Sequence, residues 1–218
     1  MLSARFSKVS TLVLITSLMA TPLASCSFGP SRVTQPGINA SSAGSQAVET
    51  YDKNSDGVIS GGELEQAPAL KAALKRLDTN SDKGVSADEI TARIEKWQEM
   101  RTGLMGFGFT VTLDGRPLEG ATVTFEPEPF LGDEIKLAMA TTDMFGTGGP
   151  SIPKELRANP STPPGIQIGL YRVKISKVVG GKELIPRKYN EDTTLGQEAA
   201  PDVGEILNRR VIFALSTK

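Results

Sequence analysis

DKNSDGVISGGE, at Asp52–Glu63, and DTNSDKGVSADE, at Asp78–Glu89, organise the first half of this chain. Each is twelve residues long and carries oxygen-bearing side chains at positions 1, 3, 5, 9 and 12. Alternate residues of such a tight loop point toward its centre, and a Glu at position 12 completes the shell with two oxygens. The spacing therefore predicts one site for a hard cation in each loop.

The predicted ligands are side-chain oxygens at five positions of each loop and the backbone carbonyl at position 7. In the first loop they are Asp52, Asn54, Asp56, Val58 (carbonyl), Ser60 and Glu63. In the second loop they are Asp78, Asn80, Asp82, Gly84 (carbonyl), Ser86 and Glu89.

Both loops resemble the EF-hand family, which implies a pair of sites for Ca²⁺. The loops differ at position 6, where the chain turns sharply with a positive φ: the first has Gly57 and the second has Lys83, with Gly84 one place later. A residue other than Gly costs roughly 1 kcal/mol at positive φ. Unless the turn shifts by one residue, we expect the second calcium site to be the weaker of the two.

The flanking residues predict the helices and the strand pair that such loops need. Ile59 and Val85, at position 8 of each loop, suit a short strand pairing between the loops. Apolar residues repeat at helical spacing over residues 70–77 and 90–97, and Pro68 suits a helix start. Because only residues 64–77 separate the loops, the helix after the first loop must end near residue 67. This shortness favours a structural role for calcium over a sensor whose helices move apart.

The first 25 residues predict a secretory signal peptide. Arg5 and Lys8 precede an apolar run at residues 9–20, and small residues follow before Cys26. The run is shorter than the roughly 20 residues that span a bilayer. LASC, ending at Cys26, resembles the bacterial lipobox, which implies that Cys26 becomes the lipidated first residue of the mature chain. A plain signal peptide cut near Ala24 and a short anchor that stays are the alternatives.

Composition limits the remaining possibilities. Residues 26–44 are rich in Ser, Gly, Pro, Gln and Ala and predict a flexible tether without structure. The 24 basic residues nearly balance the 25 acidic ones, so nothing favours binding to nucleic acid. The chain has no His, which removes the commonest general base, and its single Cys forms no internal disulfide.

The second half alternates apolar and polar residues with a period of two. This pattern covers residues 107–113, 121–125, 171–175 and 211–215, with weaker signals at 136–142 and 185–189. Such alternation predicts half-buried antiparallel strands, and six or seven short strands suggest a β-sandwich.

VTLDGRPLEGATVTF, at Val111–Phe125, resembles the start of a carboxypeptidase-regulatory-like domain of transthyretin type. Thr142-Asp143, Gly146, and Pro164-Gly165 before YRVKI continue that pattern, and IPRKYN at Ile185–Asn190 resembles small lipoproteins of planctomycete bacteria. The resemblance implies a folded spacer or adhesion module over residues 106–218 that performs no catalysis.

The sequence as a whole predicts an α+β protein of two domains, an EF-hand pair at 45–102 and a transthyretin-like β-sandwich at 106–218. We expect a calcium-binding structural or binding module, anchored by lipid in a bacterial cell envelope, at the outer membrane or the periplasmic face of the inner membrane. We do not expect an enzyme, because the carboxylates of the second half are scattered. A dockerin-like interaction module and an accessory subunit of an envelope enzyme or transport system stay open. So does the partner of the sandwich, an envelope protein or a glycan.

Overall fold

A computed structural model describes residues 33–157 and 159–218 of the chain. The predicted signal peptide, the predicted lipidation site Cys26 and the first part of the predicted tether lie outside these residues. The described residues belong to a single compact unit. None of the helices among them is long and apolar enough to cross a membrane.

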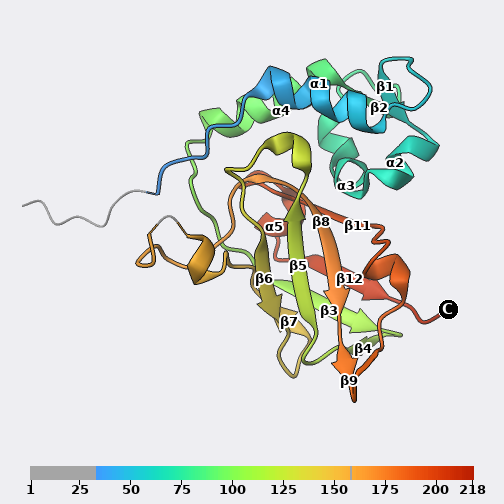
Figure 1. The fold of residues 1–218 in the computed structure, drawn as a ribbon, viewed down its shortest axis with the longest axis vertical. Helices are drawn as coiled ribbons and strands as arrows, with labels where there is room; N and C mark the ends of the chain where they lie inside the picture. The colour runs from blue at the N-terminus through green and yellow to red at the C-terminus, as the bar shows by residue number, and fades with distance from the viewer. Residues whose placement is uncertain (1–32, 158) are drawn as a thin grey trace, which may run out of the picture. The chain divides into compact units, whose positions relative to one another are not determined.

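Four helices and a two-stranded sheet form the first part of the described chain (Figure 1). They are α1 (Ala40–Tyr51), β1 (Val58–Ser60), α2 (Gly62–Gln66), α3 (Pro68–Leu77), β2 (Gly84–Ser86) and α4 (Ala87–Glu99). Helices α1 and α4 pack side by side, and buried Ile90, Ile94 and Trp97 lie along one face of α4. The predicted helices are confirmed, including the short α2 and the start of α3 at Pro68.

The predicted tether extends too far toward the first loop. Helix α1 begins at Ala40, inside residues 26–44, and the Asn39 side chain caps it by accepting a hydrogen bond from the amide of Ser42. Ile38, just before the helix, is buried in the core. The prediction of an unstructured segment was wrong for these residues because Ser- and Ala-rich sequence forms a helix when its small face packs against another helix, here α4.

The second part of the chain forms two main sheets. One has the order β11-β8-β5-β6, and the other has the order β12-β3-β4 with β7 paired to β3. The first consists of β5 (Thr122–Pro127), β6 (Ala138–Thr141), β8 (Gly169–Ser176) and β11 (Leu195–Ala199). The second consists of β3 (Phe109–Leu113), β4 (Arg116–Pro117), β7 (Thr147–Gly148) and β12 (Val211–Leu215). Short elements complete this part: η1 (Pro129–Leu131), η2 (Lys154–Leu156), β9 (Val178–Val179), β10 (Lys182–Glu183), η3 (Arg187–Tyr189) and α5 (Gly204–Leu207).

Aromatic side chains join the two sheets into one core. The ring of Phe125, on β5, lies 5.6 Å from that of Phe109 on β3 and 6.2 Å from that of Phe213 on β12, measured between centroids. All three side chains are buried, as the period-two pattern predicts for one face of each strand. The α+β class and the four stronger strand predictions are therefore confirmed.

Two details of the strand prediction are wrong. Strand β12 pairs with β3 in parallel, with Phe213 opposite Val111, so the second sheet is mixed rather than antiparallel. The alternation of apolar and polar residues shows which face a strand buries, but it does not show whether the neighbouring strand is parallel or antiparallel. Residues 187–189, expected within a strand, form the 3₁₀ turn η3, which Pro186 precedes with φ at −57°.

Helix α3 connects the helical part to the sheets. It packs against β11, at the edge of the first sheet, and also contacts β8 (Figure 1). Ala69, Leu70 and Ala73 on its inner face are all fully buried. The two parts therefore share one continuous hydrophobic core.

Candidate metal centre

The two acidic loops lie side by side because their central residues pair. Strands β1 and β2 are antiparallel, with Ile59 opposite Val85 and both side chains fully buried. The predicted pairing at position 8 of each loop is confirmed. One short ladder thus fixes both loops in a single unit.

Backbone amides shape the first loop around its acidic side chains. The carboxylate of Asp52 accepts hydrogen bonds from the amides of Ser55 (2.7 Å) and Gly57 (2.8 Å). Asp56 accepts from the amide of Val58 at 2.9 Å. The side chains at positions 1 and 5 thus accept from amides further along the loop, and the turn wraps around the carboxylate of Asp52.

Glu63 joins the two ends of the first loop. Its Oε1 accepts from the amide of Lys53 (2.8 Å), at the start, and its Oε2 accepts from the amide of Ser60 (3.0 Å), near the end. The amides of Ser60, Lys53 and Asn54 together hold the pKa of this carboxyl below its ordinary value. Glu63 is therefore anionic at neutral pH, as a cation ligand must be.

The second loop repeats this arrangement with more burial. Asp78 accepts from the amide of Lys83 at 3.0 Å, and Glu89 accepts from the amides of Thr79 (2.8 Å) and Ser86 (2.9 Å). Burial alone would raise the pKa of Glu89, but the hydrogen bonds from Ser86 and Thr79 outweigh it and lower the pKa. Ser86 and Glu89 also form a complete capping box at the start of α4.

Position 6 differs as the sequence predicts. Gly57 has φ at 89° and Lys83 has φ at 70°, so Lys83 takes the left-handed conformation and the turn does not shift to the next residue. Gly84 is needed for another reason: a Cβ there would lie 2.2 Å from Cγ1 of Val58. Two adjacent residues of the second loop are thus constrained, one by its backbone angle and one by packing.

The donor set fits Ca²⁺ by chemistry, because each loop offers carboxylate, amide, hydroxyl and carbonyl oxygens. In the described residues, however, no three side chains of Asp, Glu or Cys form a group that could hold a metal ion. Backbone amides donate to the carboxylate oxygens of Asp52 and Glu63 instead, and the side-chain amide of Asn54 donates to Asp56 at 2.8 Å. The structure brings the two loops together and gives each its turn.

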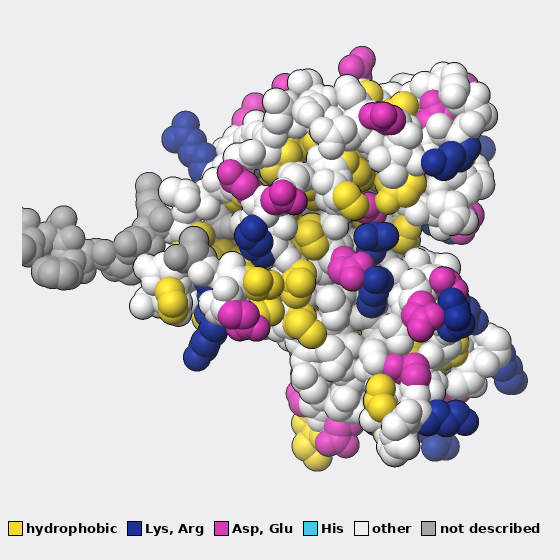
Figure 2. Space-filling view, viewed as in Figure 1, with side chains coloured by type: hydrophobic (Ala, Val, Ile, Leu, Met, Phe, Trp, Pro, Cys, Tyr) yellow, Lys and Arg dark blue, Asp and Glu magenta, His cyan; other side chains and the backbone are white. Residues whose placement is uncertain are grey.

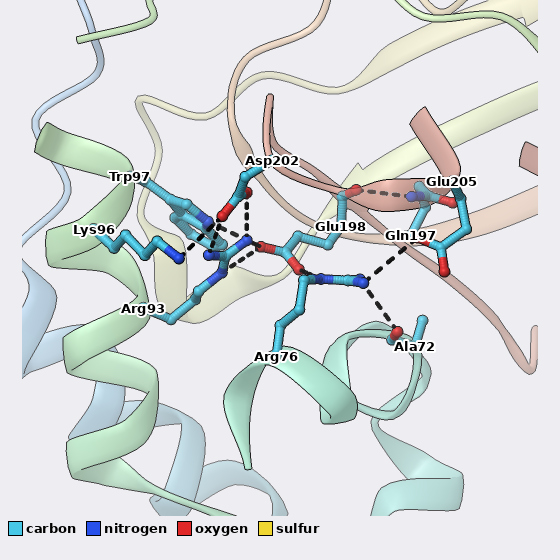
Figure 3. A network of polar contacts seen from close by, with 9 residues as sticks. All are labelled: Ala72, Arg76, Arg93, Lys96, Trp97, Gln197, Glu198, Asp202 and Glu205. Atoms are coloured by element: carbon cyan, nitrogen blue, oxygen red, sulfur yellow. Dashed lines mark hydrogen bonds and ion pairs between the residues drawn. The ribbon is translucent and has the colours of Figure 1, made fainter. Parts of the chain in front are cut away.

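A buried ionic network joins α3, α4 and β11, and it was not among the sequence predictions (Figure 3). Glu198, on β11, is fully buried, and its carboxylate pairs with Arg93 of α4 and Arg76 of α3. The indole Nε1 of Trp97 donates to Glu198 at 2.9 Å. Asp202 binds Arg93 through two hydrogen bonds of 2.8 Å, which lower its pKa to about 2. Glu89, Arg93 and Trp97 follow one another at intervals of four residues and so lie on one face of α4. This spacing is the sequence signal that could have indicated the burial of Arg93.

A second buried contact lies beside the first loop. Tyr51, the residue before Asp52, donates its hydroxyl to Glu128 at 2.6 Å. Glu128 is fully buried before η1, and burial raises its pKa although Tyr51 and Arg172 act against the shift. One of its oxygens, Oε1, has no hydrogen-bond partner among the described residues. Each loop is therefore adjacent to a side chain that binds a buried glutamate of the sheet region.

The face of the molecule drawn in Figure 2 has no large patch of a single charge, because basic and acidic side chains are interspersed across it. A scan of protein-family models and a search of curated proteins found no match for this chain.

Proposed function

We propose that the protein binds two calcium ions, one in each twelve-residue loop, and that calcium stabilises a module of the bacterial cell envelope. The observation that carries this proposal is the pairing of Ile59 with Val85 between two loops whose acidic side chains follow the same spacing. Ordinary Asp-rich turns have no reason to pair in register at position 8. The spacing of the donors within each loop matches the needs of a hard cation.

A structural role is favoured over a signalling one. Helix α2 has only five residues, and α3 packs against β11 along its inner face. A sensor exposes a groove by moving long helices apart, whereas α3 and α4 are held by buried contacts with the sheets. We therefore expect calcium to tighten an existing fold.

The place of the protein is proposed from the leader and from the second half. A lipid on Cys26 would attach the chain to an envelope membrane, and residues 106–218 would act as a transthyretin-like spacer or adhesion module. The facing sheets agree with a sandwich. The partner of that module, a protein or a glycan, is not specified by its surface.

Calcium titration of the full-length chain tests the proposal. Sites of this type outside the cytoplasm have Kd values of roughly 10⁻⁴ to 10⁻³ M. At 10 mM Ca²⁺, each site would then stabilise the fold by about 1.4 to 2.7 kcal/mol. We expect two binding events by calorimetry and a higher melting temperature.

The matched control is the double variant Glu63→Gln, Glu89→Gln, which keeps the size of both position-12 side chains, removes their charge and replaces one accepting oxygen of each with an amide nitrogen. It should lose the binding heat and the calcium-dependent rise in melting temperature. A wild-type chain that melts at the same temperature with 10 mM Ca²⁺ and with chelator would rule out the proposed function.

A further inference from the structure

The second loop is held at both ends by one buried carboxylate of the sheet. Arg76 lies two residues before Asp78, the first position of the loop, and Arg93 lies four residues after Glu89, its last position. Both guanidinium groups bind Glu198 on β11 (Figure 3). Helix α3 enters the loop and α4 leaves it, so Glu198 fixes the distance between the two ends.

The contact on α4 is rigid. Glu89, Arg93 and Trp97 follow one another at four-residue intervals on one face of the helix, and their exposed fractions are 7%, 5% and 1%. Arg93 Nε donates to Glu198 at 2.6 Å, while its other two nitrogens bind Asp202. A displacement of Glu89 would therefore move Arg93 and break several charged hydrogen bonds at once.

Burial makes this contact hard to break. Glu198 is fully buried, so its charge depends on Arg93, Arg76 and Trp97 for compensation. Removing one partner of a buried ion pair is strongly destabilising, since the other charge stays without compensation. The two helix ends are thus held where Asp78 and Glu89 must both reach the same ion.

We propose that Glu198 is the positioning residue of the second calcium site: by binding Arg76 and Arg93, it preorganises the loop and raises its affinity for Ca²⁺. This inference rests on the proposed function. Coupling of two binding equilibria is reciprocal, so calcium in the second loop stabilises β11 and the sheet to which it belongs. The support from Glu198 offsets part of the strain at Lys83.

The first loop has no equivalent support among the described residues. Tyr51, on its entering helix, donates a neutral hydroxyl to Glu128. Past the loop, on the exit side, Glu65 of α2 binds Lys71 of α3, and both side chains are about half exposed. The effect of Glu198 should therefore be specific to the second loop.

The experiment isolates the second loop by working in a Glu63→Gln background. Calcium affinity is measured by calorimetry for this protein, for Glu63→Gln with Glu198→Gln, and for Glu63→Gln with Glu205→Gln. Glu205→Gln is the matched control, because it removes the same charge at a side chain that is 58% exposed and lies 3.5 Å from Arg76. We expect Glu198→Gln to raise the Kd at least about fivefold, the lower end of typical couplings, and Glu205→Gln to change it less than twofold.

Hydrogen exchange gives the reciprocal readout. In the Glu63→Gln protein, calcium should slow exchange of the backbone amides of residues 195–199, and this protection should be lost with Glu198→Gln. If Glu198→Gln prevents folding, Asp202→Asn, which weakens the same contact at a side chain 31% exposed, takes its place with a smaller effect in the same direction.

The outcomes separate the two proposals. Equal calcium affinity with and without Glu198, or equal loss with Glu205→Gln, overturns the positioning role and leaves the calcium sites in place. No calcium binding in the wild-type chain overturns the proposed function and, with it, this inference.

Discussion

The two acidic loops share one sequence pattern but differ in how they are supported. Loop one has Gly57 at its sharp turn and a half-buried Glu63, and Tyr51, on its entering helix, donates its hydroxyl to the buried Glu128. Loop two has Lys83 at the same turn and a buried Glu89. Its flanking helices are bound to Glu198.

Local and tertiary support are therefore distributed unequally between the two loops. Loop one has the favourable local conformation, since Gly adopts a positive φ without steric cost. Loop two has a conformation that L-residues rarely adopt, and buried charges hold its ends. A loop with poorer local sequence can therefore keep its geometry where the surrounding fold fixes it.

Arg93→Met should have the largest effect. It leaves the fully buried Glu198 with less positive charge, so we expect the metal-free protein to lose about 3 to 5 kcal/mol of unfolding free energy. Denaturant unfolding in chelator, followed by the fluorescence of Trp97, measures the loss. Lys96→Met is the control: Lys96 is 59% exposed and 3.3 Å from Asp202, and the change should cost less than about 1 kcal/mol. Similar losses for both variants would refute the asymmetry.

Tyr51→Phe tests the support of loop one and should cost less. It removes one hydrogen bond and leaves Glu128 buried with poorer satisfaction, at a cost of about 1 to 3 kcal/mol at pH 7. The loss should be measured by the same denaturant unfolding in chelator. A loss larger than that of Arg93→Met would reverse our ranking of the two links.

The cost of Tyr51→Phe should also depend on pH. Burial raises the pKa of Glu128 above its value in the unfolded chain, and the Tyr51 hydrogen bond lowers it in part. A carboxyl with a raised pKa reduces stability as pH rises from its unfolded pKa toward its folded pKa, because the unfolded chain ionises first. Removing the hydroxyl raises the folded pKa further, so the variant should lose more stability at pH 7 than at pH 4. An equal loss at both pH values would exclude Glu128 as the cause.

Lys83→Gly should give the smallest effect and the opposite sign. Relief of the positive φ should stabilise the metal-free protein by about 1 kcal/mol and tighten calcium binding at loop two. Gly57→Lys is the mirror variant. A Cβ at Gly57 meets no atom within 4 Å, so backbone strain alone should destabilise loop one by about the same amount. Thermal melting in chelator measures both, and changes of the same sign would contradict the argument.

Some features of the structure could be predicted from particular residues of the sequence, and others could not. Ile59 and Val85 predicted the pairing of the loops because position 8 is defined within each loop and needs no knowledge of the rest of the chain. The alternation at residues 107–113 and 211–215 predicted strands, whereas the parallel pairing of β12 with β3 joins residues about a hundred positions apart. Glu198 looked like any other charged residue, since nothing in its neighbourhood of sequence marks it as buried.

The local features of this protein follow from its sequence alone: the two acidic loops, their turn residues, the short helix between them and the buried faces of the strands. These depend on spacing and on backbone preferences within about a dozen residues. Three contacts became visible only in the folded chain: α3 packs on β11, Arg76 and Arg93 both bind Glu198, and Tyr51 binds Glu128. Such contacts join distant parts of the chain, and burial, which gives them their strength, exists only once the whole fold has formed.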